Sequence, residues 1–111
     1  MTQINFLVQG SAKEPYEVEF LKRSETNLSA YCTCPAGKNG QYCKHRLNIL
    51  NGVTKGIVSK NLDDVKTIQS WLKNTDVEEA LNKMRNLELE AEKIKKELSK
   101  AKKEVAKSLN N

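Results

Sequence analysis

The chain is short of the residues that build a large hydrophobic core. Only 5% of its 111 residues are aromatic, whereas 30% are charged, and the formal net charge is +5. A chain of this size and composition buries a modest core, so a local cross-link or metal ion would help it fold. We therefore expect one compact domain with an extension.

Long apolar runs are also missing. No segment approaches the roughly 20 apolar residues that a membrane-spanning helix needs. The N-terminal MTQINFLVQG lacks a basic stretch, and its apolar run is too short for a secretory signal peptide. We therefore expect an intracellular protein without a membrane partner, cytoplasmic if it comes from a bacterium or a phage. Such a compartment is reducing and disfavours disulfides.

Cysteine and histidine are scarce, but they are clustered. The three cysteines and the single histidine all lie in CTCPAGKNGQYCKH, which runs from Cys32 to His45. Zinc prefers four ligands in a tetrahedron, drawn from cysteine sulfur and histidine nitrogen. Cys32 and Cys34 supply one pair of such atoms, and Cys43 and His45 supply the other. The intervening proline and glycines let the chain reverse. This spacing predicts one structural zinc ion per chain, with no coordination position open for a substrate.

Other interpretations of the cluster are open. A disulfide would strain a Cys-x-Cys ring and leave one thiol over. A Cys–His catalytic pair lacks a supporting group of carboxylates or other polar residues. The four residues could also be unliganded core. Iron could replace zinc, although a histidine ligand suits a rubredoxin-like centre poorly.

Period-two patterns precede the cluster. Apolar and polar residues alternate over 4–8, 16–20 and 28–32, which is typical of half-buried strands. The connectors GSAKEP and RSETN have the composition of turns. These segments predict a small antiparallel β-meander that leads directly into Cys32.

A helix is expected directly after the cluster. Leu47 and Leu50 share a helical face with Cys43, and Gly52 stands where this helix would stop. Residues 53–60 are either a connector or a short extra strand.

Two further helices are expected. The first spans 62–73, with Asn61 as its cap. Its apolar positions are Leu62, Val65, Ile68 and Leu72. The second opens on the capping-box sequence Thr75-Asp76-Val77-Glu78 and continues without glycine or proline to about Leu109. Its length of roughly 50 Å exceeds the width of a small domain, so part of it must project, fold back or meet a partner.

The predicted fold class is α+β. A small antiparallel β-meander and a zinc-stapled strand-to-helix unit are followed by a helix and a long C-terminal helix. We expect a zinc-binding ββα-type domain over 1–60, a connecting helix over 61–75, and a long amphipathic helix with coiled-coil character over 76–111.

The cluster resembles the SWIM-type zinc finger. CTC, a short loop, and GQYCKH with an apolar helix after it follow that family's pattern of Cys-x-Cys, a variable spacer and Cys-x-His. Gly40 occupies the place of a glycine that often lies three residues before the third ligand. The resemblance covers roughly residues 16–52 and implies strands followed by a helix. SWIM fingers occur in transposases, helicase-like ATPases and ubiquitin-ligase-related proteins, which implies nucleic-acid or protein binding.

The sequence contains no Gly-rich phosphate loop and no acidic triad, so we expect neither catalysis nor a small-molecule substrate. Nucleic acid, DNA before RNA, is the first expected partner, because cations surround the cluster. The candidate contact residues are Lys38, Tyr42, Lys44, Arg46, Asn48 and Lys55. Ordinary solvated lysines would give a similar pattern, since the first sixty residues hold eight basic residues against four acidic ones.

The C-terminal helix is the second candidate for a partner surface. Read as heptads, it places Val77, Met84, Ala91, Leu98 and Val105 at a, and Ala80, Leu87, Ile94, Ala101 and Ser108 at d. The flanking pairs are Lys83–Glu88, Glu90–Lys95 and Glu97–Lys102, which are opposite in sign across a parallel homodimer. Alanine and serine make this seam weak. A single helix packed on 62–73, or another protein partner along 76–109, therefore stays open.

Overall fold

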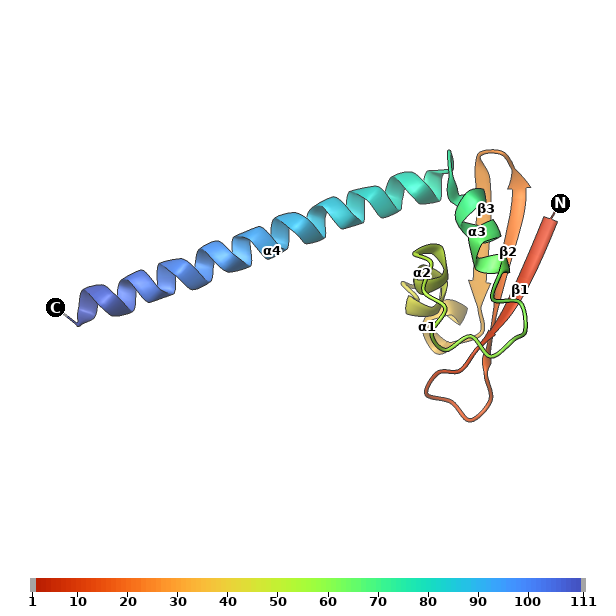
Figure 1. The fold of residues 1–111 in the computed structure, drawn as a ribbon, viewed down its shortest axis with the longest axis horizontal. Coiled ribbons are helices and arrows are strands. Elements are labelled where there is room, and N and C mark those ends of the chain that lie inside the picture. Colours follow the sequence, from red (N-terminus) through yellow and green to blue (C-terminus); the bar gives the residue numbers. More distant parts are fainter. Residues whose placement is uncertain (1, 111) are drawn as a thin grey trace. The chain divides into compact units, whose positions relative to one another are not determined.

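The computed structural model describes residues 2–110 and divides into two compact units, Met1–Glu78 and Glu79–Asn111. The first unit holds a sheet and three short helices, and most of one long helix forms the second (Figure 1). The predicted α+β class is therefore confirmed. The division into 1–60, 61–75 and 76–111 stays a prediction.

Three antiparallel strands form the sheet, in the order β1–β2–β3. They are β1 (Thr2–Val8), β2 (Tyr16–Ser24) and β3 (Asn27–Cys32). The predicted meander is confirmed, although β2 runs on to Ser24, past its expected end at residue 20. Leu21 and Lys22 extend the strand because they pair with Ser29 and Leu28 of β3, and the alternation within β2 alone does not reveal that pairing.

One face of the sheet carries the core. Phe6 and Phe20 are almost fully buried, and their rings meet edge to face with centroids 6.0 Å apart. Aromatic pairs favour this geometry. The register places Val18, also fully buried, opposite Cys32. The packing of the sheet therefore holds the first metal-ligand candidate at the edge of the core.

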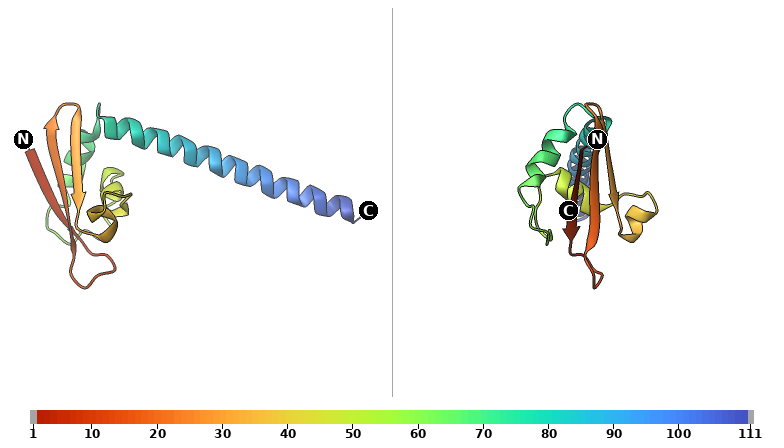
Figure 2. Two further views of the ribbon diagram at one scale, coloured as in Figure 1. Left: turned by 180° about the vertical axis from the view of Figure 1, so that it is seen from behind. Right: turned by 90° about the vertical axis from the view of Figure 1, so that its right-hand side faces the viewer.

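Helices α2 (Lys44–Leu50) and α3 (Asp64–Leu72) pack against each other and lie on one side of the sheet (Figure 2). Their buried side chains are Ile49, Leu50, Val65, Ile68 and Leu72. The chain leaves α2 at Gly52, as predicted. This residue has a φ of 82°, and its N–H donates to the Ile49 carbonyl at 3.0 Å, which is a common way to end a helix.

The start of α3 differs from the prediction. The helix begins at Asp64 with Asp63 as its N-cap, so the expected cap at Asn61 is wrong. Asn61 donates from its side-chain amide to the Asn5 carbonyl (2.9 Å) and to the Asp64 carboxylate (3.2 Å). Leu62 lies in the turn before the helix and is 48% exposed, so it is not part of the apolar face.

The segment 53–60 is a connector beside β1 and not a full strand. Its one isolated β-bridge joins Ile57 to Val8. The backbone N–H of Gln9 donates to the Gly56 carbonyl at 2.8 Å. This bond ties down the beginning of the loop that follows β1, and that loop passes close to the metal-ligand candidates.

Helix α4 (Asp76–Leu109) begins close to the predicted cap. Thr75 Oγ1 accepts a hydrogen bond from the Glu78 N–H at 3.2 Å, and the Glu78 carboxylate accepts one from the Asn74 N–H at 3.1 Å. In a standard capping box the second bond would come from Thr75 itself. Within residues 2–110, no helix combines the length and the apolar character that crossing a membrane requires.

Candidate metal centre

The four candidate ligands lie at a strand end and at two helix starts. Cys32 ends β3, Cys34 is the N-cap of α1 (Pro35–Lys38), Cys43 is the N-cap of α2, and His45 lies in the first turn of α2. The sequence interpretation missed α1 and expected only a chain reversal. A proline at the first helical position after a capping residue is a helix-start signal that would have indicated it.

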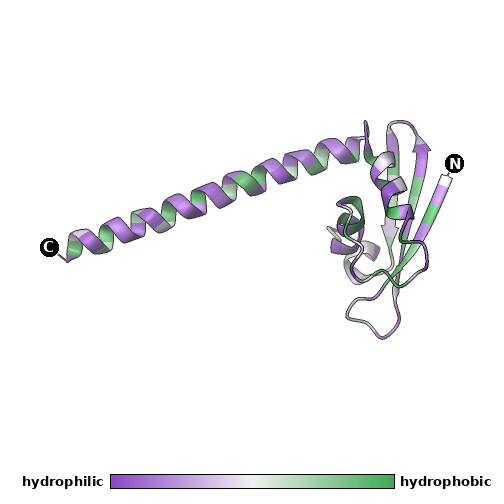
Figure 3. Ribbon diagram, viewed as in Figure 1, coloured by the Kyte–Doolittle hydropathy of each residue, from purple (hydrophilic) through white to green (hydrophobic). Residues whose placement is uncertain are grey.

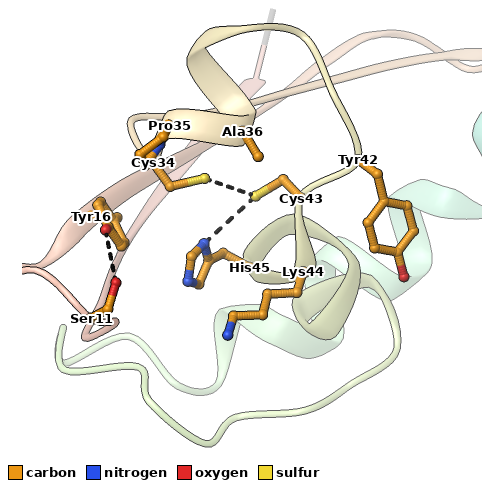
Figure 4. A pocket seen from close by; sticks show the side chains of 9 residues that line it. All are labelled: Ser11, Tyr16, Cys34, Pro35, Ala36, Tyr42, Cys43, Lys44 and His45. Atoms are coloured by element: carbon orange, nitrogen blue, oxygen red, sulfur yellow. Dashed lines mark hydrogen bonds between the residues drawn. The ribbon is translucent and has the colours of Figure 1, made fainter.

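The donor atoms converge as a zinc site requires. Three sulfurs and one ring nitrogen all lie within 4.8 Å of one another. Cys34 Sγ and Cys43 Sγ are 3.4 Å apart (Figure 4). His45 Nδ1 lies 3.7 Å from Cys43 Sγ and 3.8 Å from Cys32 Sγ. Tetrahedral zinc with ordinary bond lengths separates two sulfurs by about 3.8 Å, and a sulfur from a nitrogen by about 3.6 Å. The side chains therefore fit a zinc ion with shifts of a few tenths of an ångström at these contacts.

Gly37 makes the close approach of α1 to β3 possible. Its N–H donates to Cys34 Sγ at 3.3 Å. A Cβ at this position would lie 2.8 Å from Cys32 Cβ and would also collide with the Cys32 carbonyl oxygen. Gly40 differs, because its φ of 69° is left-handed but a Cβ there would meet no atom within 4 Å. Gly37 is thus needed for space and Gly40 for backbone conformation.

The candidate donors differ in how readily they lose a proton. Burial raises the pKa of the Cys32 thiol to about 12. Burial acts in the same direction on Cys43, but the Arg46 N–H and the neighbouring thiols hold the pKa of Cys43 below its usual value. Burial, with the charge of Lys44, lowers the pKa of His45, which favours the neutral imidazole. A neutral imidazole can coordinate zinc, and a divalent ion replaces the protons of coordinating thiols.

A loop packs around His45 on the side away from the sulfurs. The Tyr16 ring lies against the imidazole, with centroids 5.0 Å apart. A Cβ on Gly10 would lie 2.6 Å from Tyr16 Cε2 and 3.2 Å from His45 Nε2. Any larger residue at position 10 would therefore require the Tyr16 ring to shift. Sequence reasoning missed Gly10 and Tyr16 as parts of the site, because neither carries a ligand atom and the loop contact depends on tertiary structure.

The six predicted contact residues lie on α1, on α2 and in the segments that flank α2. Five of them are exposed, namely Lys38, Tyr42, Lys44, Asn48 and Lys55. Arg46 is half-buried, and its guanidinium donates to the carbonyls of Ala30 (3.1 Å) and Gln41 (2.5 Å). This arginine therefore ties α2 to β3 and to the segment before α2.

The site brings together the end of one strand and the starts of two helices. Three thiols and an imidazole converge there, which is the arrangement of a zinc finger. Residues 16–50 match the family model described as the SWIM zinc finger. Neither a curated protein nor a solved structure matches the chain. The matched segment nearly coincides with the span of residues 16–52 over which the sequence resembles that family. That class of domain is a binding module, and the converging Cys32, Cys34, Cys43 and His45 support one zinc ion in this chain.

Proposed function

We propose that the protein is a non-enzymatic zinc-finger module that binds nucleic acid. The main support is the distribution of charge. Between Glu25 and Asp63 the chain has five basic residues and no acidic one. This segment contains the metal centre, α1, α2 and the connector after α2. Phosphate groups favour such a surface, because the cations release counterions from the nucleic acid when they bind it.

Zinc would organise this surface without taking part in a reaction. Four protein ligands fill a tetrahedral site and leave no open coordination position. Lys44 lies between the ligands Cys43 and His45 in the chain, and Tyr42 precedes Cys43. Coordination therefore restricts where these two side chains can reach. We place DNA before RNA because SWIM fingers occur in transposases and helicase-like ATPases.

A salt titration tests this function. We expect a labelled DNA duplex or single strand to bind at low salt and to weaken as salt rises. Replacing Lys38 and Lys44 together by glutamine should reduce the log–log salt slope by about one per lysine. The matched control replaces Lys96 and Lys103 of α4, which changes the net charge equally. Absence of binding to both DNA forms at low salt would refute the function.

A second function, protein–protein interaction through α4, is favoured by exposed apolar side chains. Apolar residues recur along α4 among polar ones (Figure 3). The large ones at a and d positions are Leu87, Ile94, Leu98 and Val105, between 53% and 62% exposed. A second copy of this helix in parallel orientation would cover them and pair each flanking charge with its opposite. Such a dimer would carry two zinc fingers and raise avidity for a repeated target.

Sedimentation equilibrium of the full chain tests the second function. We expect a dimer, and we expect the double variant Ile94→Glu, Leu98→Glu to be monomeric because both charges fall within the apolar seam. Leu89→Glu is the matched control, since Leu89 is 71% exposed but lies outside the a and d positions. A monomeric wild-type chain that binds no protein partner would contradict this function.

A further inference from the structure

A pocket of about 430 Å³ opens beside the metal centre. Its volume falls within the roughly 300–1,000 Å³ of small-ligand sites. Cys34, Cys43 and His45 form the wall nearest the metal centre, and the aliphatic Pro35 and Ala36 continue it (Figure 4). The space is thus bounded on one side by groups that coordination would hold rigid.

Two tyrosines give the pocket aromatic surfaces. Tyr42 lines it while remaining 69% exposed, so core packing does not account for its position. Tyr16 lines it as well, and its hydroxyl lies 3.5 Å from that of Ser11. Figure 4 shows Tyr42 on one side and the Ser11–Tyr16 pair on the other. The pocket therefore has an aromatic surface at one end and hydroxyl groups at the other, with Cys43, His45 and Lys44 between them.

His45 adds a hydrogen-bond donor to the pocket. Its Nδ1 faces the sulfurs, so a neutral ring that coordinates through this atom carries its proton on Nε2. A metal-bound histidine usually donates that N–H to an oxygen of the protein. Within residues 2–110, no oxygen accepts from Nε2. Because Gly10 lies next to Nε2, a ligand can reach this N–H only from the pocket side of the loop.

Lys44 supplies a positive charge at the same place. Its side chain lines the pocket and is exposed, and Figure 4 shows it extending beside His45. The complement of these groups is a flat aromatic ring with carbonyl oxygens and an attached anion. A nucleobase joined to a phosphate has this chemistry, and unpaired bases stack readily on aromatic side chains.

We propose that the pocket binds one unpaired nucleobase, stacked on Tyr42, with a flanking phosphate on Lys44. The inference rests on the proposed nucleic-acid function and specifies its substrate as single-stranded. A base inside a duplex is paired and stacked, so it cannot enter the pocket without being flipped out. The module should therefore bind a single strand more tightly than a duplex.

The test uses the zinc-loaded full chain and fluorescence anisotropy. The probes are a labelled oligothymidylate of about ten nucleotides, a blunt duplex of the same length, and thymidine monophosphate as competitor. Tyr42→Ala should weaken binding of the single strand about 5- to 150-fold, which is the range for loss of one stacked base. Tyr42→Phe should retain the affinity because it keeps the ring. Tyr31→Ala is the matched control, since Tyr31 is 52% exposed on β3 and does not line the pocket.

The outcomes separate this inference from the function on which it rests. Preference for the single strand, lost in Tyr42→Ala and kept in both other variants, supports the pocket. Competition by the monophosphate that depends on Tyr42 also supports it and identifies free nucleotides as a second source of the ligand. Equal binding of strand and duplex, with Tyr42→Ala behaving like Tyr31→Ala, overturns the pocket but leaves the function standing. If neither DNA binds, both proposals fail.

Discussion

Removal of zinc should unfold the unit Met1–Glu78. The perturbation is a strong chelator, or the variant Cys43→Ser, which leaves three ligands and a hydroxyl group that stays protonated at neutral pH. A bound ion would join β3, α1 and α2, and both helices pack against β3 beside the site. Without it, three buried thiols and an imidazole lose the partner that offsets their desolvation.

The magnitudes favour unfolding over a small loss of stability. A single core in a chain segment of this size rarely supplies more than about 3–5 kcal/mol. Zinc bound to peptides of zinc-finger type contributes about 10–16 kcal/mol near pH 7. Without the ion the unit keeps only the contribution of its core, and the uncompensated desolvation of three buried thiols and an imidazole must be subtracted from that. We therefore expect the metal-free unit to be unfolded at 25 °C.

Tryptophan fluorescence reports on this unit alone. Trp71 is the only tryptophan, and it lies half-buried on α3. Its emission should shift to the red when zinc is chelated and return when excess zinc is added. Lys44→Ala is the control, because it changes the neighbour of a ligand and keeps all four donors. The expectation is wrong if chelated wild-type protein and Cys43→Ser show native emission and the same denaturant midpoint as the zinc-loaded protein. Zinc would then not stabilise this fold.

Three further outcomes are expected. Gly37→Ala should weaken zinc binding in a chelator competition assay, because its methyl group meets the Cys32 backbone. Gly40→Ala should lower only the free energy of unfolding, by the roughly 1–2 kcal/mol of a left-handed residue. Equal losses of zinc affinity in the two variants would contradict this reasoning. Gly10→Ala should displace the ring of Tyr16 and change the NMR chemical shifts of that ring and of the His45 imidazole. Unchanged spectra would show that the loop accommodates the added methyl group without moving the ring. Zinc affinity should rise between pH 6 and pH 8. Burial raises the pKa of Cys32 to about 12, so this thiol must release a proton to bind the ion, and that release becomes easier as the pH rises. A pH-independent affinity would count against thiolate ligation.

Features that depend on short segments were predictable. Period-two alternation indicated β1, β2 and β3, since a strand with one buried face must alternate whatever it packs against. The four ligands lie within one short stretch, so their spacing and chemistry alone indicated a zinc site. The boundaries were less predictable. β2 extends to Ser24 through pairing with β3, and α3 starts at Asp64, while the Asn61 side chain donates to the Asn5 carbonyl instead of capping the helix.

The sequence by itself determined the candidate ligand set, the order of the three strands, and the acid-free basic segment, because these follow from residue type and local spacing. Only the tertiary structure decided that His45 turns Nδ1 to the sulfurs, that Gly10 lies against its ring, and that Arg46 bonds to carbonyl groups. It also decided that Tyr16 and Tyr42 line one pocket. These arrangements join segments that are distant in the chain, and the packing of the sheet, loop and helices sets them.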